Sequence, residues 1–127
     1  MSEQTSHPVK VTGYHAHVYF DAAQRDTASR LRDTIASKFV VEAGAFADEP
    51  RGPHPIAQFN IIFKAPEFQQ LVPWLMFNRD GLDVLVHPLT DNSFDDHSIN
   101  ALWLGTPVPL LLERLRPTYR RELLPNA

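Results

Sequence analysis

The sequence contains no cysteine. Disulfides, thiolate catalysis and sulfur-ligated metals are therefore excluded. Any metal must be held by histidine, aspartate or glutamate, which are donors that suit iron(II), manganese or zinc. No apolar run approaches the ~20 residues that a transmembrane helix needs, and residues 1–8 lack the hydrophobic region of a signal peptide. We therefore expect a cytoplasmic protein without a membrane partner.

An excess of positive charge is also missing. Twelve Lys and Arg residues stand against 15 Asp and Glu residues, and the net charge is -3. This balance gives no electrostatic reason to expect a nucleic-acid partner. Apolar residues make up 43% of the 127 residues, which is typical of a globular protein. We expect a single domain over 1–127, with flexible tails at 1–10 and about 118–127.

Hydrophobic periodicity predicts two helices and four strands in the order β-α-β-β-α-β. The strands are expected at 12–20, 39–43, 58–63 and 82–87. Asp21 and Gln24 predict a capped helix that ends near 38. Pro66 is placed to open a second helix, which Pro73 kinks and which ends by 81. The order indicates an α+β, ferredoxin-like fold with a C-terminal extension.

The extension is less regular. We expect a short helix that is capped by Asp95 or Asp96 and reaches about Leu104. Residues 110–112 are consistent with either an edge strand or a helical turn. We expect Asp83, on the fourth strand, to be a surface charge rather than a metal ligand.

His15 and His17 alternate along the first strand, in the sequence YHAHVYF at 14–20. Because strand side chains alternate, both rings project to one face, about 6.7 Å apart along the backbone. Such a pair forms half of a metal site or a pair of proton-transfer groups. Taken alone, the pattern more often reflects one ring that stacks on Tyr19 and another that lies at the surface.

The predicted sheet gathers further histidines beside this pair. The two-residue period puts polar side chains of three strands on the face away from the helices. The antiparallel fourth strand should bring His87 beside His15 and His17. We expect the third strand to run parallel to the first, so that the preceding loop brings His54 to the same end. His97 follows the fourth strand and can fold back over this face.

Six short motifs, in order, resemble the DOPA 4,5-dioxygenase family of fungi and bacteria. They are YHAHVYF at 14–20, GPHP at 52–55, PWL at 73–75, NRDGLDVLVHP at 78–88, DH at 96–97 and WLG at 103–105. The resemblance implies a small ferredoxin-like protein, often dimeric, with non-haem iron(II). It implies extradiol opening of a catechol such as L-DOPA with O2.

Extradiol cleavage needs a metal with open positions, a base and an acid, and histidine suits all these roles. Our hypothesis is that His17, His54 and His87 bind iron(II), with zinc or another divalent metal as a substitute in a purified protein. His15 and His97 would transfer protons or hold the substrate. An exchange of roles between His15 and His17 stays open.

Three further residues are candidates for substrate binding. Arg79 would bind a substrate carboxylate, or else interact with a helix dipole. Asn60 would donate to a phenolate, or make an ordinary strand hydrogen bond. Tyr19 would form a pocket wall, or pack at an interface. Since Tyr19, Ile62 and Leu85 are expected on an uncovered face, we expect a homodimer.

Two other functions compete with the dioxygenase. One is a non-catalytic, dimeric ferredoxin-like module that binds a metal or a small aromatic ligand. The other is a metal-free enzyme, such as an isomerase, that uses the histidines as acid and base.

Overall fold

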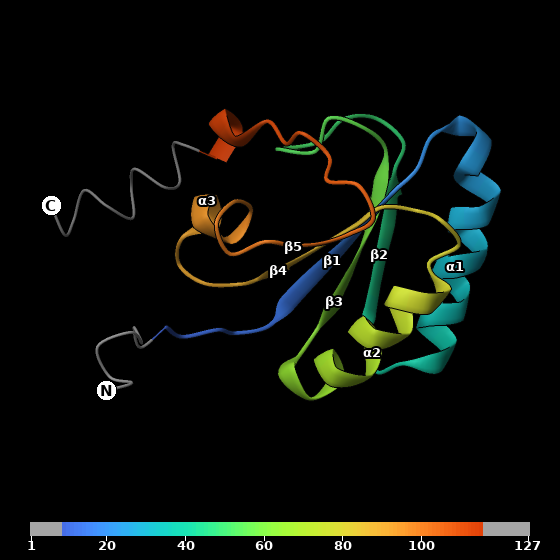
Figure 1. Cartoon of the computed structure of the whole chain (residues 1–127), viewed down its shortest axis with the longest axis horizontal. Coiled ribbons are helices and arrows are strands. Elements are labelled where there is room, and N and C mark those ends of the chain that lie inside the picture. Colours follow the sequence, from blue (N-terminus) through green and yellow to red (C-terminus); the bar gives the residue numbers. More distant parts are fainter. Residues whose placement is uncertain (1–8, 116–127) are drawn as a thin grey trace, which may run out of the picture.

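The computed structural model describes residues 9–115, in which a five-stranded antiparallel sheet has the order β2-β3-β1-β4-β5. The predicted tail segments 1–8 and 118–127 lie outside this range. The predicted α+β class and β-α-β-β-α-β order are confirmed, with β5 as an addition (Figure 1). The elements in chain order are β1 (Tyr14–Tyr19), η2 (Ala22–Gln24), α1 (Arg25–Lys38), β2 (Glu42–Ala47), β3 (Gln58–Phe63), α2 (Ala65–Asn78), β4 (Val84–Pro88), α3 (Ser93–Asp96), β5 (Leu102–Leu104) and η3 (Leu112–Leu115).

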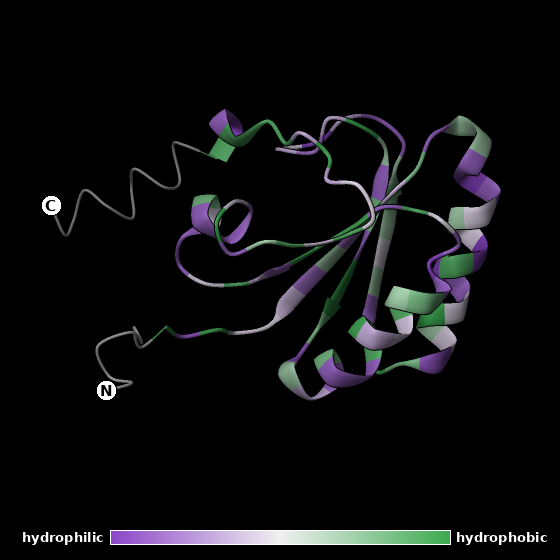
Figure 2. Cartoon of the chain, viewed as in Figure 1, coloured by the Kyte–Doolittle hydropathy of each residue, from purple (hydrophilic) through white to green (hydrophobic). Residues whose placement is uncertain are grey.

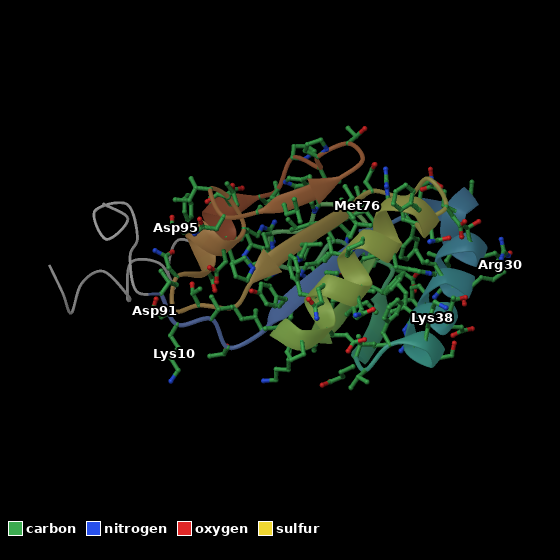
Figure 3. All side chains as sticks on the ribbon, turned by 60° about the horizontal axis from the view of Figure 1, so that its bottom comes forward. Lys10, Arg30, Lys38, Met76, Asp91 and Asp95 are labelled. Carbon is green, nitrogen blue, oxygen red and sulfur yellow. The ribbon has the colours of Figure 1, made fainter. Side chains whose placement is uncertain are left out.

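Helices α1 and α2 cover one face of the sheet and enclose the hydrophobic core (Figure 1). Figure 2 shows hydrophobic and hydrophilic bands alternating along α1, as expected for a helix with one buried side. Arg30 and Lys38 project from the outer side of this helix (Figure 3). The predicted inward residues of all three central strands are buried: Ala16, Val18, Phe20, Phe59, Ile61, Phe63, Leu82, Val84 and Val86.

Local signals explain where the helices begin. Asp21 accepts from the backbone N–H of Gln24, and the Gln24 side chain accepts from the backbone N–H of Asp21, so the predicted capping box is present. Pro66 lies in the first turn of α2, where its missing N–H is tolerated. Helix α2 continues through Pro73 to Asn78.

The expected parallel pairing of the first and third strands is wrong. Strand β3 pairs antiparallel with β1, with Tyr19 opposite Gln58. The reason is that α1 returns the chain so that β2 runs in the direction of β1, and the β2–β3 connection then reverses it. The start of β3 therefore lies at the C-terminal end of β1.

Three boundaries also differ from the prediction. Strand β2 spans 42–47 instead of 39–43, with a register shift between Ala43 and Phe46. Asn92, rather than Asp95 or Asp96, caps α3. Residues 102–104 form edge strand β5 instead of the end of that helix, and the turn after 110 is the 3-10 helix η3.

The sheet face away from α1 and α2 is partly covered by the same chain. The loop after β2 and the segment that follows β4 lie over it, and the Leu111 N–H donates to the Pro53 carbonyl at 2.8 Å. Tyr19 and Leu85 are only 2% and 0% exposed. Their burial removes the reason for expecting a second copy over these two residues, and the homodimer stays a prediction. Within 9–115, no helix is long and apolar enough to cross a membrane.

Candidate active site

Five histidines from four parts of the fold line one cavity of about 390 Å³ on the face away from α1 and α2. The convergence predicted from the sequence is therefore present. His15 and His17 lie on β1, His87 on β4, His54 in the loop before β3, and His97 directly after α3. No histidine of this set lies outside the cavity.

The central strands fix the first three rings. His15 lies directly opposite His87 in the antiparallel β1–β4 register, and His17 is two residues further along the same face. The ring centroids of His15 and His87 are 5.2 Å apart, those of His17 and His87 5.1 Å, and those of His15 and His17 5.6 Å. These three rings thus form a nearly even triangle on rigid backbone.

His54 reaches the cluster by a tight turn rather than by a parallel strand. The backbones of Arg51 and His54 exchange two hydrogen bonds of 3.0 and 2.9 Å, and Gly52 adopts a left-handed conformation between them. The turn folds the loop back over the sheet, so the His54 ring lies 4.1 Å from that of His17. A hydrogen bond of 2.7 Å joins its Nδ1 to the Tyr19 hydroxyl.

His97, directly after α3, lies beside His87. Its ring centroid lies 4.0 Å from that of His87, and its Nδ1 donates to the Ser93 carbonyl at 2.8 Å. Asp96, which is 2% exposed, holds this segment by accepting from the backbone N–H and the hydroxyl of Thr90 at 2.9 and 2.6 Å. The carboxylate therefore anchors the histidine-bearing segment.

A hydrogen bond from Nδ1 also orients the rings of His17 and His87. His17 donates from Nδ1 to the Gln58 side-chain oxygen at 2.9 Å, and His87 donates from Nδ1 to the Pro88 carbonyl at 2.8 Å. When Nδ1 carries the proton of a neutral imidazole, Nε2 is left with a lone pair. Both Nε2 atoms are therefore available as ligands.

Burial keeps these imidazoles neutral. It is the largest cause of the lowered pKa of every ring in the cluster. Together with the neighbouring histidines, it lowers the pKa of His54 to about 4 and that of His87 to about 3. The pKa of His17 lies well below 6.5 for the same reason. Neutral histidine is the form that binds metals.

The arrangement fits a divalent metal. The Nε2 atoms of His17 and His87 lie 3.1 Å apart, and two lone pairs at this distance require a proton or a cation between them. Nitrogen ligands at about 2.1 Å from a metal lie about 3.0 Å apart at a right angle and about 3.4 Å apart at a tetrahedral angle. The observed separation lies in the range expected for two nitrogen ligands of one metal ion.

The ligand atoms form two overlapping groups in which all atoms lie within 4.8 Å of one another. One consists of His15, His17 and His87, and the other of His17, His54 and His97. The structure does not bring the predicted ligands His54 and His87 into the same group. His17 belongs to both groups and is thus the shared member.

The predicted substrate-binding residues have different locations. Asn60 lies opposite His17 on β3 and lines the cavity. Tyr19 is buried behind His54 and stacks on Trp103. Arg79 ends α2 and donates to the Met76 carbonyl at 2.9 Å. It is not among the residues that line the cavity, and we assign it no role in the proposed site.

Sequence reasoning missed three residues of this cavity. Gln58 orients His17, Asp96 anchors the His97 segment, and Arg51 lies at the rim. Gln58 had a readable signal, since it lies on the same strand face as Asn60. Arg51 lies in the loop before β3 and Asp96 ends the four-residue helix α3, and both are in segments too short or irregular to show a hydrophobic period.

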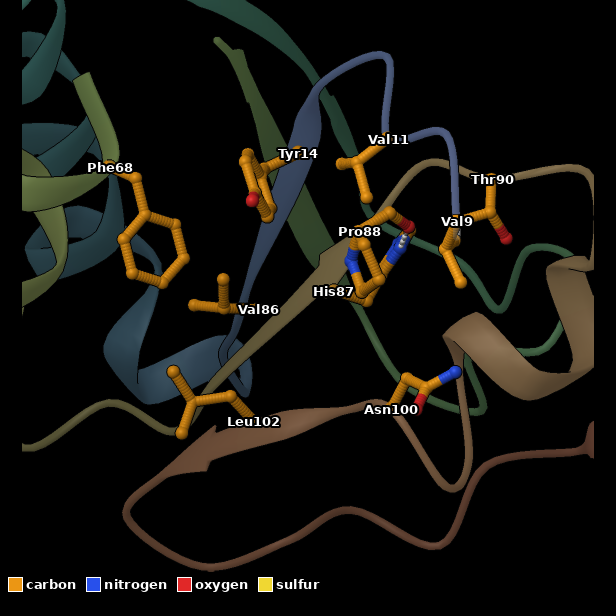
Figure 4. Close-up of a pocket in the computed structure, with 10 residues that line it drawn as sticks. All are labelled: Val9, Val11, Tyr14, Phe68, Val86, His87, Pro88, Thr90, Asn100 and Leu102. Carbon is orange, nitrogen blue, oxygen red and sulfur yellow. Dashed lines mark hydrogen bonds between the residues drawn. The ribbon is translucent and has the colours of Figure 1, made fainter. Parts of the chain in front are cut away.

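A second cavity, of about 380 Å³, lies at the β4–β5 edge of the sheet (Figure 4). It is mostly apolar, with Val86, Leu102 and Phe68 in its wall. His87 and Thr90 line both cavities. His87 therefore separates a polar cavity from an apolar one.

Comparison with known proteins finds related sequences in fungi. The chain is 33% identical over 123 residues to the DOPA 4,5-dioxygenase of Amanita muscaria, covering 88% of this chain and 53% of that protein. It is 34% identical over 118 residues to an uncharacterized 21.2 kDa protein of Botryotinia fuckeliana, covering 81% and 64%. The chain thus spans about half to two thirds of the length of these curated relatives.

A solved structure is more similar still. It is the crystal structure of a candidate dioxygenase from Nostoc punctiforme, with a TM-score of 0.83 and 48% identity. The match covers 84% of this chain and 93% of that one. In addition, the family model of the Dopa 4,5-dioxygenase family matches residues 14–114. The chain belongs to the Dopa 4,5-dioxygenase family.

Proposed function

We propose that this protein is a non-haem iron(II) dioxygenase that opens the ring of a catechol, L-DOPA or a related compound, by extradiol cleavage with O2. The observation that carries the proposal is the pair of Nε2 atoms of His17 and His87, 3.1 Å apart, on rings whose Nδ1 atoms are occupied. Family membership supports the oxygenase chemistry.

We propose His15, His17 and His87 as the metal ligands, which replaces His54 of the sequence hypothesis with His15. These three form one of the two compact groups and are carried by the paired strands β1 and β4. Three protein ligands leave coordination positions for other molecules. A bound iron(II) would supply a Lewis acid for the two catechol oxygens and redox chemistry toward O2.

His54 and His97 would then serve the substrate. Both rings face the same cavity, and both are kept in the neutral form by burial. A neutral ring has a lone pair that can accept a proton from a phenolic hydroxyl whose pKa a bound metal would lower, and it can return this proton to the product. Tyr19 would position His54 through their 2.7 Å hydrogen bond, and the Asn60 amide would donate to a phenolic oxygen.

Anaerobic reconstitution tests the function directly. The metal-free protein is loaded with iron(II), mixed with L-DOPA or other catechols, and exposed to O2. We expect oxygen uptake and a yellow ring-opened product, both abolished by a chelator. A protein that binds iron or the catechol without oxygen uptake would support the non-catalytic module, and activity that survives chelation would support the metal-free enzyme.

Single alanine variants test the ligand set. His17→Ala should lose iron because His17 belongs to both groups. His15→Ala and His87→Ala should also lose iron, whereas His54→Ala and His97→Ala should retain it and lose turnover. Iron content after desalting gives the readout. Retention of iron in His87→Ala together with loss in His54→Ala would assign the metal to the other group.

A further inference from the structure

Arg51 lies at the rim of the histidine cavity, and its guanidinium group has no partner among the described residues 9–115. Within residues 9–115, Arg25 and Asp48 form an ion pair, whereas the Arg51 side chain forms neither an ion pair nor a hydrogen bond. Arg51 is also the one Lys or Arg residue among the described residues that line this cavity. An unpaired cation beside a site for a small molecule is a candidate for recognising an anion.

The backbone aims this side chain toward the cluster. Arg51 and His54 form an isolated antiparallel bridge, with two reciprocal hydrogen bonds. Residues directly opposite each other in an antiparallel pair project their side chains to the same face. Because the His54 ring points to His17, the Arg51 side chain leaves the turn on that same side.

The space between Arg51 and the histidines suits the side chain of an aromatic substrate. Ala45, Ala47 and Gly52 line it with little bulk, and the Asn60 amide has no hydrogen-bond partner among the described residues. The acidic residue in the cavity wall, Asp96, is occupied by its two hydrogen bonds to Thr90. No free carboxylate in this wall competes for Arg51.

We propose that Arg51 forms an anion subsite, which binds a carboxylate on the side chain of the aromatic substrate. A guanidinium can hold a carboxylate through two parallel hydrogen bonds, which adds direction as well as charge. The inference rests on the proposed function, since it assumes that the catechol ring lies at the histidines. It defines the substrate class as aromatic acids rather than neutral catechols.

Anaerobic calorimetry on the iron(II)-loaded protein tests the subsite without turnover. The two probes are 3,4-dihydroxyphenylpropionate and its primary amide, which have the same ring and nearly the same shape. We expect the wild-type protein to prefer the acid by on the order of ten- to a hundredfold, the range of a charge-assisted hydrogen bond. Arg51→Gln should bind the amide as the wild type does and lose the preference, and Arg51→Lys should keep part of it.

The control is Arg30→Gln, on the outer side of α1 (Figure 3), which should leave both affinities unchanged. Equal binding of acid and amide by the wild-type protein, or an equal loss of both in Arg51→Gln, would overturn the subsite. A clear preference for the acid without oxygen uptake would keep the subsite and refute the dioxygenase. Failure of both probes to bind would refute both the subsite and the proposed dioxygenase.

Discussion

Four of the five histidines of the cluster have a hydrogen-bond partner at Nδ1. His17, His87 and His97 donate to a side-chain amide or a backbone carbonyl, and His54 is joined to a phenol. Such outer partners set the tautomer and the orientation of a ring. His15 has no side-chain hydrogen bond to a described residue, so the strand backbone and the neighbouring rings of His17 and His87 orient it. The rings are thus unequal although the residue type is the same.

Gln58→Leu tests this principle at the buried ring of His17. The substitution leaves the His17 Nδ1–H without an acceptor, which should lower the free energy of unfolding by roughly 1–3 kcal/mol. It should also weaken metal binding by roughly ten- to a hundredfold, because no acceptor then keeps the proton on Nδ1 and the lone pair on Nε2. Metal titration of the apo protein provides the measurement. Gln70→Leu, an exposed change on α2, is the control, and equal metal affinity in both variants would contradict the role of Gln58.

Among the elements, β2 and β3 leave no room for a side chain at Gly44, beside the cavity residue Asn60. Asn60 on β3 lies against Gly44 on β2, and a Cβ atom at position 44 would overlap the Asn60 side-chain oxygen. The absence of a side chain at Gly44 therefore decides where the Asn60 amide points. A glycine in an irregular strand thus shapes the site without touching a ligand.

Gly44→Ala should consequently displace Asn60 and destabilise the fold by roughly 1–3 kcal/mol, as expected for overpacking. The double variant Gly44→Ala, Asn60→Ala should recover most of this loss, because the overlapping oxygen is gone. Urea unfolding of the four proteins in this cycle measures the coupling between the two sites. Additive effects would show that the two side chains do not compete for this space.

The sequence predicted the elements that have strong periodicity. Strand β3 was predicted with its observed bounds, since its buried apolar residues Phe59, Ile61 and Phe63 recur at every second position. Strand β2 was displaced because Gly44 and Ala45 weaken the pattern where the strand is irregular. Strand β5 has three residues, too few to show a period, and its pairing with β4 is a tertiary choice.

The gathering of the histidines was predicted correctly, but the strand arrangement that was expected to bring His54 there was wrong. His15, His17 and His87 meet through a register that alternation alone indicates. His54 was expected to reach the cluster because β3 would run parallel to β1. Strand β3 is antiparallel instead, and the turn between Arg51 and His54 places the His54 ring in the cluster. Contacts made by loops depend on turn geometry and on the tertiary fold, which a single sequence does not encode in its hydrophobic pattern.

For the whole molecule, the cluster links stability to pH. The pKa values of His54 and His87 are about 4 and 3 in the folded protein and near 6.5 in the unfolded chain. Between these values the unfolded chain binds more protons than the folded protein does. The contribution of these two histidines to the free energy of unfolding is therefore complete above pH 6.5, and it decreases as the pH falls toward 4.

We expect the metal-free protein to lose on the order of 1.4 kcal/mol per pH unit for each histidine that only the unfolded chain protonates. Urea unfolding between pH 7.5 and 5 measures this slope before most carboxylates titrate. Bound metal should protect the protein in the upper part of this range, since it competes with protons for the same nitrogens. A free energy of unfolding that is constant over this range would contradict the prediction.

Because His17 belongs to both groups of ligand atoms, it limits the number of metal ions that the cluster can bind. Its Nδ1 atom is committed to Gln58, so its single remaining lone pair can serve one ion at a time. Five histidines within one cavity therefore do not imply a dinuclear centre built on this ring. A titration of the chain with iron(II) should saturate at one equivalent, whichever group holds the ion.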